Sequence, residues 1–165
     1  MHVRTVGALA TLALLGGCAG NWPQTAGEGG AAAAAGTGVA AVNNSVVPGS
    51  EEDLKTNVGD RVFFDFNRSG LATDAKATLD RQGAWLAKYA HVNVQISGNC
   101  DERGTEEYNI ALGQRRANAA RDYLVAKGTA AGRITTISYG KDRPAALGSN
   151  EGAWRQNRNA ITAVK

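Results

Sequence analysis

Charged side chains are confined almost entirely to the C-terminal part of this chain, and that asymmetry limits where a folded core can form. Between Thr5 and Gly49 the only charged residue is Glu28, whereas acidic and basic residues are mixed from Glu51 onward. The segment that starts at Glu51, about 115 residues, is long enough to bury one modest core. The 18 basic and 15 acidic residues give a net charge of +3. A balance this close argues against nucleic-acid binding as the main role.

The first residues have the pattern of an export signal, which we predict over residues 1–17. A positive charge at Arg4 precedes the apolar run Val6–Leu15, which is too short to span a bilayer as a stable helix. Two glycines and Cys18 follow. This resembles a bacterial lipobox, in which the cysteine is acylated and becomes the first residue of the mature chain. Because no aspartate follows the cysteine, the anchor is expected in the outer membrane, with the folded part in the periplasm. The alternative is an ordinary signal peptide and an incidental cysteine.

Residues 18–50 are expected to form a lipidated, disordered tether. Nine alanines and seven glycines fill half of the 32 positions from 19 to 50, a composition that buries too little apolar surface to fold. As a flexible coil it would span roughly 30 Å and would set reach without carrying chemistry. The only other cysteine is Cys100, so lipidation of Cys18 would leave no pair for a disulfide within the chain.

The remaining residues alternate between strand and helix patterns. Four stretches predict strands: 61–66, 92–98, 134–139 and 160–164. Three stretches predict helices: 73–89, 106–127 and 151–157. We expect Ser50 and Asp53 to cap a short first turn and Thr73 to cap the first long helix. Val62, Phe64 and Phe66 should share one face of the first strand. The expected fold class is α+β, an α/β sandwich with helices packed on a small mixed sheet in the order βαβαβ(α)β.

An arginine interrupts the apolar stripe of the long helix at 106–127. At 100° per residue, Arg116 falls in the middle of a stripe whose other members are apolar or aromatic: Tyr108, Leu112, Ala119 and Tyr123. A buried guanidinium without a partner costs several kcal/mol, so we expect it to pair with a carboxylate. The nearest acidic candidates are Asp101 and Glu102, in the loop before the helix.

These residues predict a pocket between the end of the second strand and the long helix. It would hold an acid, Asp101, an amide, Asn109, and the cation of Arg116. A pocket with both signs of charge suits a zwitterionic ligand, whose carboxylate meets the guanidinium and whose ammonium meets the carboxylate. Spacing alone favours the alternative, a structural Asp–Arg pair that ties the loop to the helix.

Longer motifs resemble one family. They are Val62–Phe66, Gly98–Thr105, Tyr108–Asn109, Leu112–Asn118, Ser138–Lys141 and Gln156–Arg158. Together they closely resemble the OmpA-like C-terminal domain family, and the resemblance covers the whole expected folded domain, residues 51–165. It implies helices packed on a small mixed sheet and non-covalent binding of peptidoglycan through the diaminopimelate of the stem peptide. For a lipid-anchored member it also implies TolB and TolA as partners, with roles in envelope integrity and cell division.

The resemblance also implies the residues of the site. The ligand-binding aspartate and arginine of the family fall on Asp101 and Arg116, and the family asparagine falls on Asn109. Three further positions match residues that line the pocket: Asp65, Leu112 and Arg158. No cofactor and no metal is implied.

Two positions depart from the family pattern, and a cysteine, Cys100, lies next to Asp101 in the sequence. Asn99 stands where the family usually has histidine, so any contribution from that ring is lost. Asn159 stands where the family usually has a second arginine, which would weaken a partner contact if that charge served one. We expect Cys100 to be a small, half-buried residue that points away from Asp101. The alternatives are a reactive thiol or a metal ligand acting with Asp101.

An enzymatic role is not expected. After removal of the signal, His91 is the only histidine, and no cluster has zinc-ligand spacing. No Ser/His/Asp or Cys/His set is evident, although Cys100 and His91 are both present. The alternatives to wall binding are another OmpA-like lipoprotein that acts in envelope assembly or adhesion, and a cell-wall hydrolase.

Overall fold

The computed structural model describes residues 46–165. The predicted signal peptide, Cys18 and the tether up to residue 45 lie outside these residues. No helix in the described part of the chain is both apolar and long enough to cross a bilayer.

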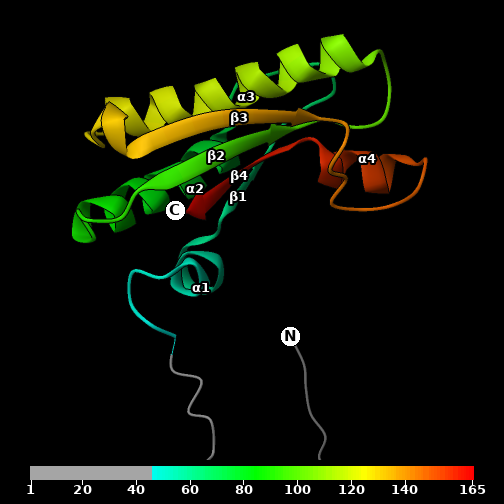
Figure 1. Cartoon of the computed structure of the whole chain (residues 1–165). Helices are drawn as coiled ribbons and strands as arrows, with labels where there is room; N and C mark the ends of the chain where they lie inside the picture. Colours follow the sequence, from blue (N-terminus) through cyan, green and yellow to red (C-terminus); the bar gives the residue numbers. More distant parts are fainter. Residues whose placement is uncertain (1–45) are drawn as a thin grey trace, which may run out of the picture. The chain divides into compact units, whose positions relative to one another are not determined.

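One mixed four-stranded sheet forms the centre of the fold (Figure 1). Its strands are β1 (Arg61–Phe63), β2 (Val94–Asn99), β3 (Ile134–Gly140) and β4 (Asn159–Val164), in the order β1-β4-β2-β3. The strands β2 and β3 run parallel, whereas β4 is antiparallel to both β1 and β2. The predicted α+β class and mixed sheet are confirmed.

Two long helices, α2 (Thr73–Lys88) and α3 (Glu106–Ala126), share one hydrophobic core with the sheet. Leu79 of α2, Ile96 of β2 and Ala120 of α3 are all completely buried in it. The remaining elements are short: α1 (Glu51–Asp53), a π-helical turn (Leu54–Val58), a 3₁₀ turn (Ala131–Arg133) and α4 (Glu151–Asn157). The predicted long helix and the predicted helix at 151–157 are therefore confirmed.

The first strand is shorter than predicted. The chain leaves the sheet after Phe63, and Phe66 is 58% exposed instead of sharing the buried face with Val62. The cause is that arginines take the next two carbonyls. Arg158 Nε donates to the oxygen of Phe64 at 3.1 Å, and Arg116 Nη2 donates to the oxygen of Asp65 at 3.0 Å. The second strand also starts later than predicted, at Val94.

Helix caps follow the sequence in one case and not in another. The Ser50 side chain accepts from the backbone N of Asp53 at 3.2 Å, as predicted. The prediction that Thr73 caps α2 is wrong, because Ala72 occupies the cap position and Thr73 is the first helical residue. Its neighbour Asp74 lies in the first turn, where its charge favours the positive end of the helix dipole.

The buried face of α3 is rotated from the predicted stripe. Leu112 and Arg116 are buried, but Tyr108 is 44% exposed. The buried face instead includes Gly113 and Ala120, because small residues let the helix lie directly on β2. A Cβ on Gly98 of β2 would meet the carbonyl oxygen of Gly113 at 1.8 Å. This contact sets the distance between α3 and the sheet.

We expect Gly98→Ala to destabilise the protein by at least about 2 kcal/mol, because the added methyl must push α3 away from β2. Gly83→Ala in α2 is the matched control. The nearest atoms to a Cβ there lie at 3.7 Å and 3.8 Å, so the greater helix propensity of alanine should stabilise by up to about 1 kcal/mol. Urea unfolding measures both. Equal effects of the two substitutions would contradict the close-contact account.

The N-terminal turn is fastened to α2 through one carboxylate, that of Asp53. It accepts from the backbone N of Gly49 at 2.9 Å, from Asn57 Nδ2 at 2.8 Å and from the indole of Trp85 at 2.8 Å. These hydrogen bonds, led by that of Asn57, lower the pKa of Asp53 from 3.8 to about 2. The fold therefore favours the ionised form.

This lowered pKa predicts a pH-dependent effect of Asp53→Asn. The carboxylate stabilises the fold above its unfolded pKa of 3.8, and that contribution is lost as the pH falls towards about 2. We expect the melting temperature of Asp53→Asn to lie below that of the wild type at neutral pH, and the gap to narrow as the pH falls through this range. Thermal melts followed by circular dichroism test this. A gap that stays constant would refute it.

Candidate functional site

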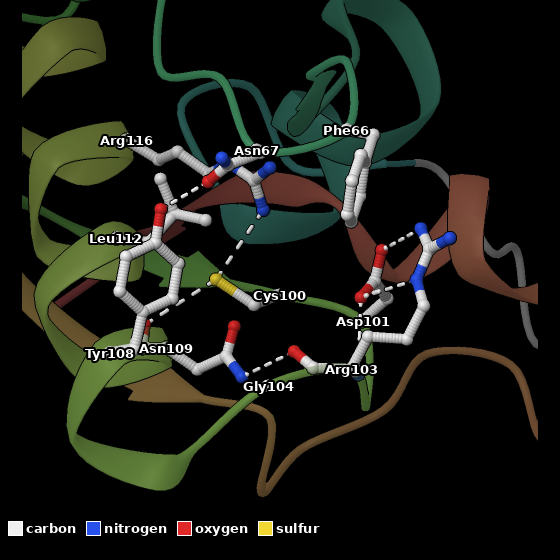
Figure 2. A pocket seen from close by; sticks show the side chains of 10 residues that line it. All are labelled: Phe66, Asn67, Cys100, Asp101, Arg103, Gly104, Tyr108, Asn109, Leu112 and Arg116. Atoms are coloured by element: carbon white, nitrogen blue, oxygen red, sulfur yellow. Dashed lines mark hydrogen bonds and ion pairs between the residues drawn. The ribbon is translucent and has the colours of Figure 1, made fainter.

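A pocket of about 150 Å³ opens where the loop after β2 meets the first half of α3 (Figure 2). Ten residues line it: Phe66, Asn67, Cys100, Asp101, Arg103, Gly104, Tyr108, Asn109, Leu112 and Arg116. This volume holds several water molecules, which is enough room for the end group of an amino acid. The predicted pocket is therefore present.

Arg116 is completely buried at the base of this pocket. Its guanidinium donates to three backbone carbonyls: Arg68 O at 2.9 Å, Asn99 O at 2.8 Å and Asp65 O at 3.0 Å. It also contacts Cys100 Sγ at 3.4 Å. Burial lowers the pKa of Arg116, but a guanidinium stays charged in proteins.

The expected direct pairing of Arg116 with a carboxylate is wrong. Within residues 46–165, no carboxylate oxygen lies within ion-pair distance of its guanidinium. Three backbone carbonyls supply the hydrogen bonds instead, two from the turn after β1 and one from the last residue of β2. The arginine therefore carries a buried positive charge that is hydrogen-bonded but not neutralised by contact. Such a site attracts an anion.

Asp101 is buried as well, 4% exposed, and it pairs with two other arginines. Its Oδ2 accepts from Arg103 Nη2 at 2.6 Å and from Arg158 Nη1 at 3.4 Å. Burial raises the pKa of the Asp101 carboxyl, but the hydrogen bonds and charge of Arg103, with Arg158, outweigh it and hold this pKa below its usual value. The Asp101 carboxylate therefore stays ionised at neutral pH.

Asn109 lies in the pocket, as predicted. Its Nδ2 donates to the carbonyls of Arg103 at 2.8 Å and Thr105 at 3.0 Å. These two bonds leave the side-chain oxygen turned towards the cavity (Figure 2). The amide thus fixes the loop before α3 and offers an acceptor to a ligand.

Of the three positions that the family resemblance added, only one lines the pocket. Leu112 lines the pocket. Asp65 does not, because its side chain is exposed and only its backbone carbonyl reaches Arg116. Arg158 lies outside the lining and acts behind it. It joins Asp101 to Phe64 O at 3.1 Å and to Glu151 Oε1 at 2.7 Å.

Cys100 is buried, 3% exposed, so the expectation of a half-buried residue is wrong. Its Sγ faces Arg116, whereas the Asp101 carboxylate faces Arg103 (Figure 2). Its Sγ donates to the carbonyl of Asn109 at 3.4 Å. Burial raises the pKa of the Cys100 thiol. The thiol is therefore protonated at neutral pH, which disfavours the reactive-thiol alternative. Within residues 46–165, no three His, Cys, Asp or Glu side chains gather as a metal site.

The two positions that depart from the family pattern contact each other. Asn99 Nδ2 donates to Asn159 Oδ1 at 2.8 Å, and Asn159 Nδ2 donates to the carbonyl of Gln156 at 2.6 Å. Asn159 is completely buried. Position 159 therefore supports the backbone beside the pocket, and the missing second arginine is not a missing surface charge.

Sequence reasoning missed an aromatic sandwich at the pocket rim. The Arg103 guanidinium lies 4.0 Å from the ring centre of Phe66 and 4.1 Å from that of Trp154. Trp154 in turn donates to Glu102 Oε1 at 3.0 Å. These residues come from three distant segments with no shared spacing, so only the family motif around Arg103 could have drawn attention to them.

Comparisons with known proteins agree with this geometry. A sequence model of the OmpA family matches residues 63–158. A peptidoglycan-associated lipoprotein from Rhizobium meliloti is 52% identical over 131 residues, which are 79% of this chain and 73% of the relative. One from Brucella melitensis is 46% identical over 150 residues, 90% of this chain and 83% of the relative. The chain therefore belongs to the OmpA family.

Solved structures of known proteins have the same fold. The peptidoglycan-associated lipoprotein from Burkholderia pseudomallei matches with a TM-score of 0.63 and 39% identity, covering 64% of this chain and 90% of that chain. The C-terminal domain of Helicobacter pylori MotB matches with a TM-score of 0.60 at 18% identity, over 64% of this chain and 84% of that chain. The second match shows that the fold persists when most of the sequence has changed.

The buried carbonyl contacts of Arg116 predict a large structural cost for its removal. Arg116→Met keeps most of the side-chain volume but leaves three carbonyls without their donor, so we expect a loss of at least about 3 kcal/mol in urea unfolding. Arg121→Met on the same helix is the control. That side chain pairs with Asp122 at the surface, and its loss should change stability by at most about 0.5 kcal/mol. Comparable losses for both would contradict the anchoring role.

Proposed function

We propose that this chain is an outer-membrane lipoprotein that binds peptidoglycan non-covalently through the diaminopimelate of the stem peptide. It thereby links the outer membrane to the cell wall. The observation that carries the proposal is the pocket itself, where a buried carboxylate and a buried guanidinium without a carboxylate partner line one small cavity. The name shared by the relatives, peptidoglycan-associated lipoprotein, supports it.

The charges assign the two ends of the ligand. The free end of diaminopimelate carries an ammonium and a carboxylate on one carbon. Asp101 is the only anionic side chain among the residues that line the pocket, so it receives the ammonium. The carboxylate lies towards Arg116, whose positive charge has no contacting anion in the described part of the chain. Asn109 and Leu112 complete the contact through an amide oxygen and an apolar surface.

The N-terminal segment supplies the second attachment. Acylation of Cys18 would hold the chain in the outer membrane, with residues 18–50 as tether and residues 51–165 as the periplasmic wall-binding domain. Because the tether confines the pocket near the wall, the effective concentration is high and a modest affinity at each pocket suffices. The resemblance to lipid-anchored members of the family adds TolB and TolA as proposed partners in the Tol-Pal system.

Removal of the Asp101 charge should abolish wall binding. We expect full-length Asp101→Asn, purified in detergent, to stay in the supernatant when wild-type protein sediments with purified sacculi. Arg116 is unsuitable for this test because its loss also weakens the fold. Sacculi with lysine in place of diaminopimelate should retain less wild-type protein, because lysine lacks the second carboxylate.

Asp122→Asn is the matched control, since Asp122 also pairs with a neighbouring arginine but lies at the surface of α3. It should sediment like the wild type. Equal sedimentation of Asp101→Asn and the wild type would exclude this site. Release of soluble wall fragments during incubation would point to a hydrolase instead.

A further inference from the structure

The Asp101 carboxylate is saturated by donors from its own chain. Its Oδ1 accepts from the backbone N of Arg103 and from Arg103 Nε, both at 3.2 Å. Its Oδ2 accepts from Arg103 Nη2 at 2.6 Å and from Arg158 Nη1 at 3.4 Å. A carboxylate offers about four lone-pair positions. A ligand ammonium can therefore bind Asp101 only if one of these donors leaves.

Arg103 is the donor whose side chain can leave. It is 32% exposed, whereas the side chain of Arg158 is 5% exposed. Arg158 is also held by Phe64 O at 3.1 Å and by Glu151 at 2.7 Å, which fix it between the end of β1 and α4. The side-chain hydrogen bonds of Arg103, by contrast, go to Asp101.

The surroundings of Arg103 can stabilise it after it leaves Asp101. Its guanidinium lies between the rings of Phe66 and Trp154, at 4.0 Å and 4.1 Å, and such contacts hold a cation without using its N–H groups. The negative charges of Glu151 and Glu102 also attract the Arg103 guanidinium and favour its charged form. Figure 2 shows the Arg103 fork facing Asp101, with Phe66 beside the pair.

We propose that the Arg103 side chain occupies the ammonium position of the pocket in the free protein, and that a ligand reaches Asp101 by displacing it. This inference rests on the proposed function, because it concerns the same pocket. It makes Arg103 a specificity-determining residue. While its fork covers Asp101, the pocket presents only positive charge and accepts any small carboxylate. Once the fork is displaced, the bare Asp101 carboxylate selects ligands that carry an ammonium and repels those that do not.

Calorimetric titration of two small probes into the full-length protein in detergent tests this competition. The probes are meso-diaminopimelate and pimelate, the same carbon chain without its ammonium groups. In Arg103→Gln we expect diaminopimelate to bind about fivefold more tightly than in the wild type, because no internal cation competes for Asp101. Pimelate should bind several-fold more weakly, because the pocket has lost a positive charge.

Arg121→Gln is the matched control. Arg121 donates to the adjacent Asp122 through Nε and Nη2, as Arg103 does to Asp101, but at the far end of α3. It removes the same charge from the chain and should leave both affinities unchanged. Arg103→Lys, which keeps the charge and loses the fork, should fall between the wild type and Arg103→Gln. It provides a second readout if the glutamine variant unfolds.

The outcomes separate this inference from the proposed function. If the wild type binds diaminopimelate and Arg103→Gln binds it equally or more weakly, Arg103 does not compete with the ligand and the inference is overturned while wall binding stands. If neither protein binds diaminopimelate, the proposed function fails first. Opposite shifts for the two probes support the competition.

Discussion

The burial of one guanidinium organises this domain. Arg116 lies on α3 but donates to carbonyls of Asp65 and Arg68, in the turn after β1, and of Asn99, at the end of β2. Both segments are thereby fixed against the helix. The arrangement requires α3 to lie directly on the sheet, which the contact of Gly98 with Gly113 permits. Without that close approach the guanidinium would not reach the loops, and the pocket would have no base.

A second arginine performs the matching task for the acid. Arg158 links Asp101 to Phe64, the residue after β1, and to Glu151 of α4. The loop after β2 is thereby tied to both of these segments. The result is a division of labour among three arginines. Arg116 supplies a buried charge, Arg158 fixes the carboxylate from behind, and Arg103 covers it from the solvent side. Both buried charges can persist in the free protein because each already has its hydrogen bonds.

The departures from the family pattern are best understood as one feature. Asn99 and Asn159 form a buried hydrogen bond between β2 and β4, and the backbone carbonyl of Asn99 is an acceptor of Arg116. A change at Asn99 therefore acts on the guanidinium directly, and a change at Asn159 acts on it through Asn99. Neither side chain lines the pocket, so both changes leave the lining side chains intact. Relative to the family pattern, the absence of the histidine ring and of the second arginine changes the packing behind the pocket and not the pocket lining.

The sequence by itself determined the long helix, predicted at 106–127 and observed to Ala126, and the short helix at 151–157, because periodicity is a local signal. The family motifs then predicted that Asp101, Asn109 and Arg116 gather around one pocket, which they line. The sequence did not determine where the first strand ends or what Arg116 binds. Those outcomes depend on backbone carbonyls, which every residue carries and no pattern distinguishes. The sandwich of Arg103 between Phe66 and Trp154 is of the same kind, since its members meet only after the chain has folded. Only the tertiary structure decided these contacts, because a buried charge is hydrogen-bonded by whichever acceptors the folded chain places beside it.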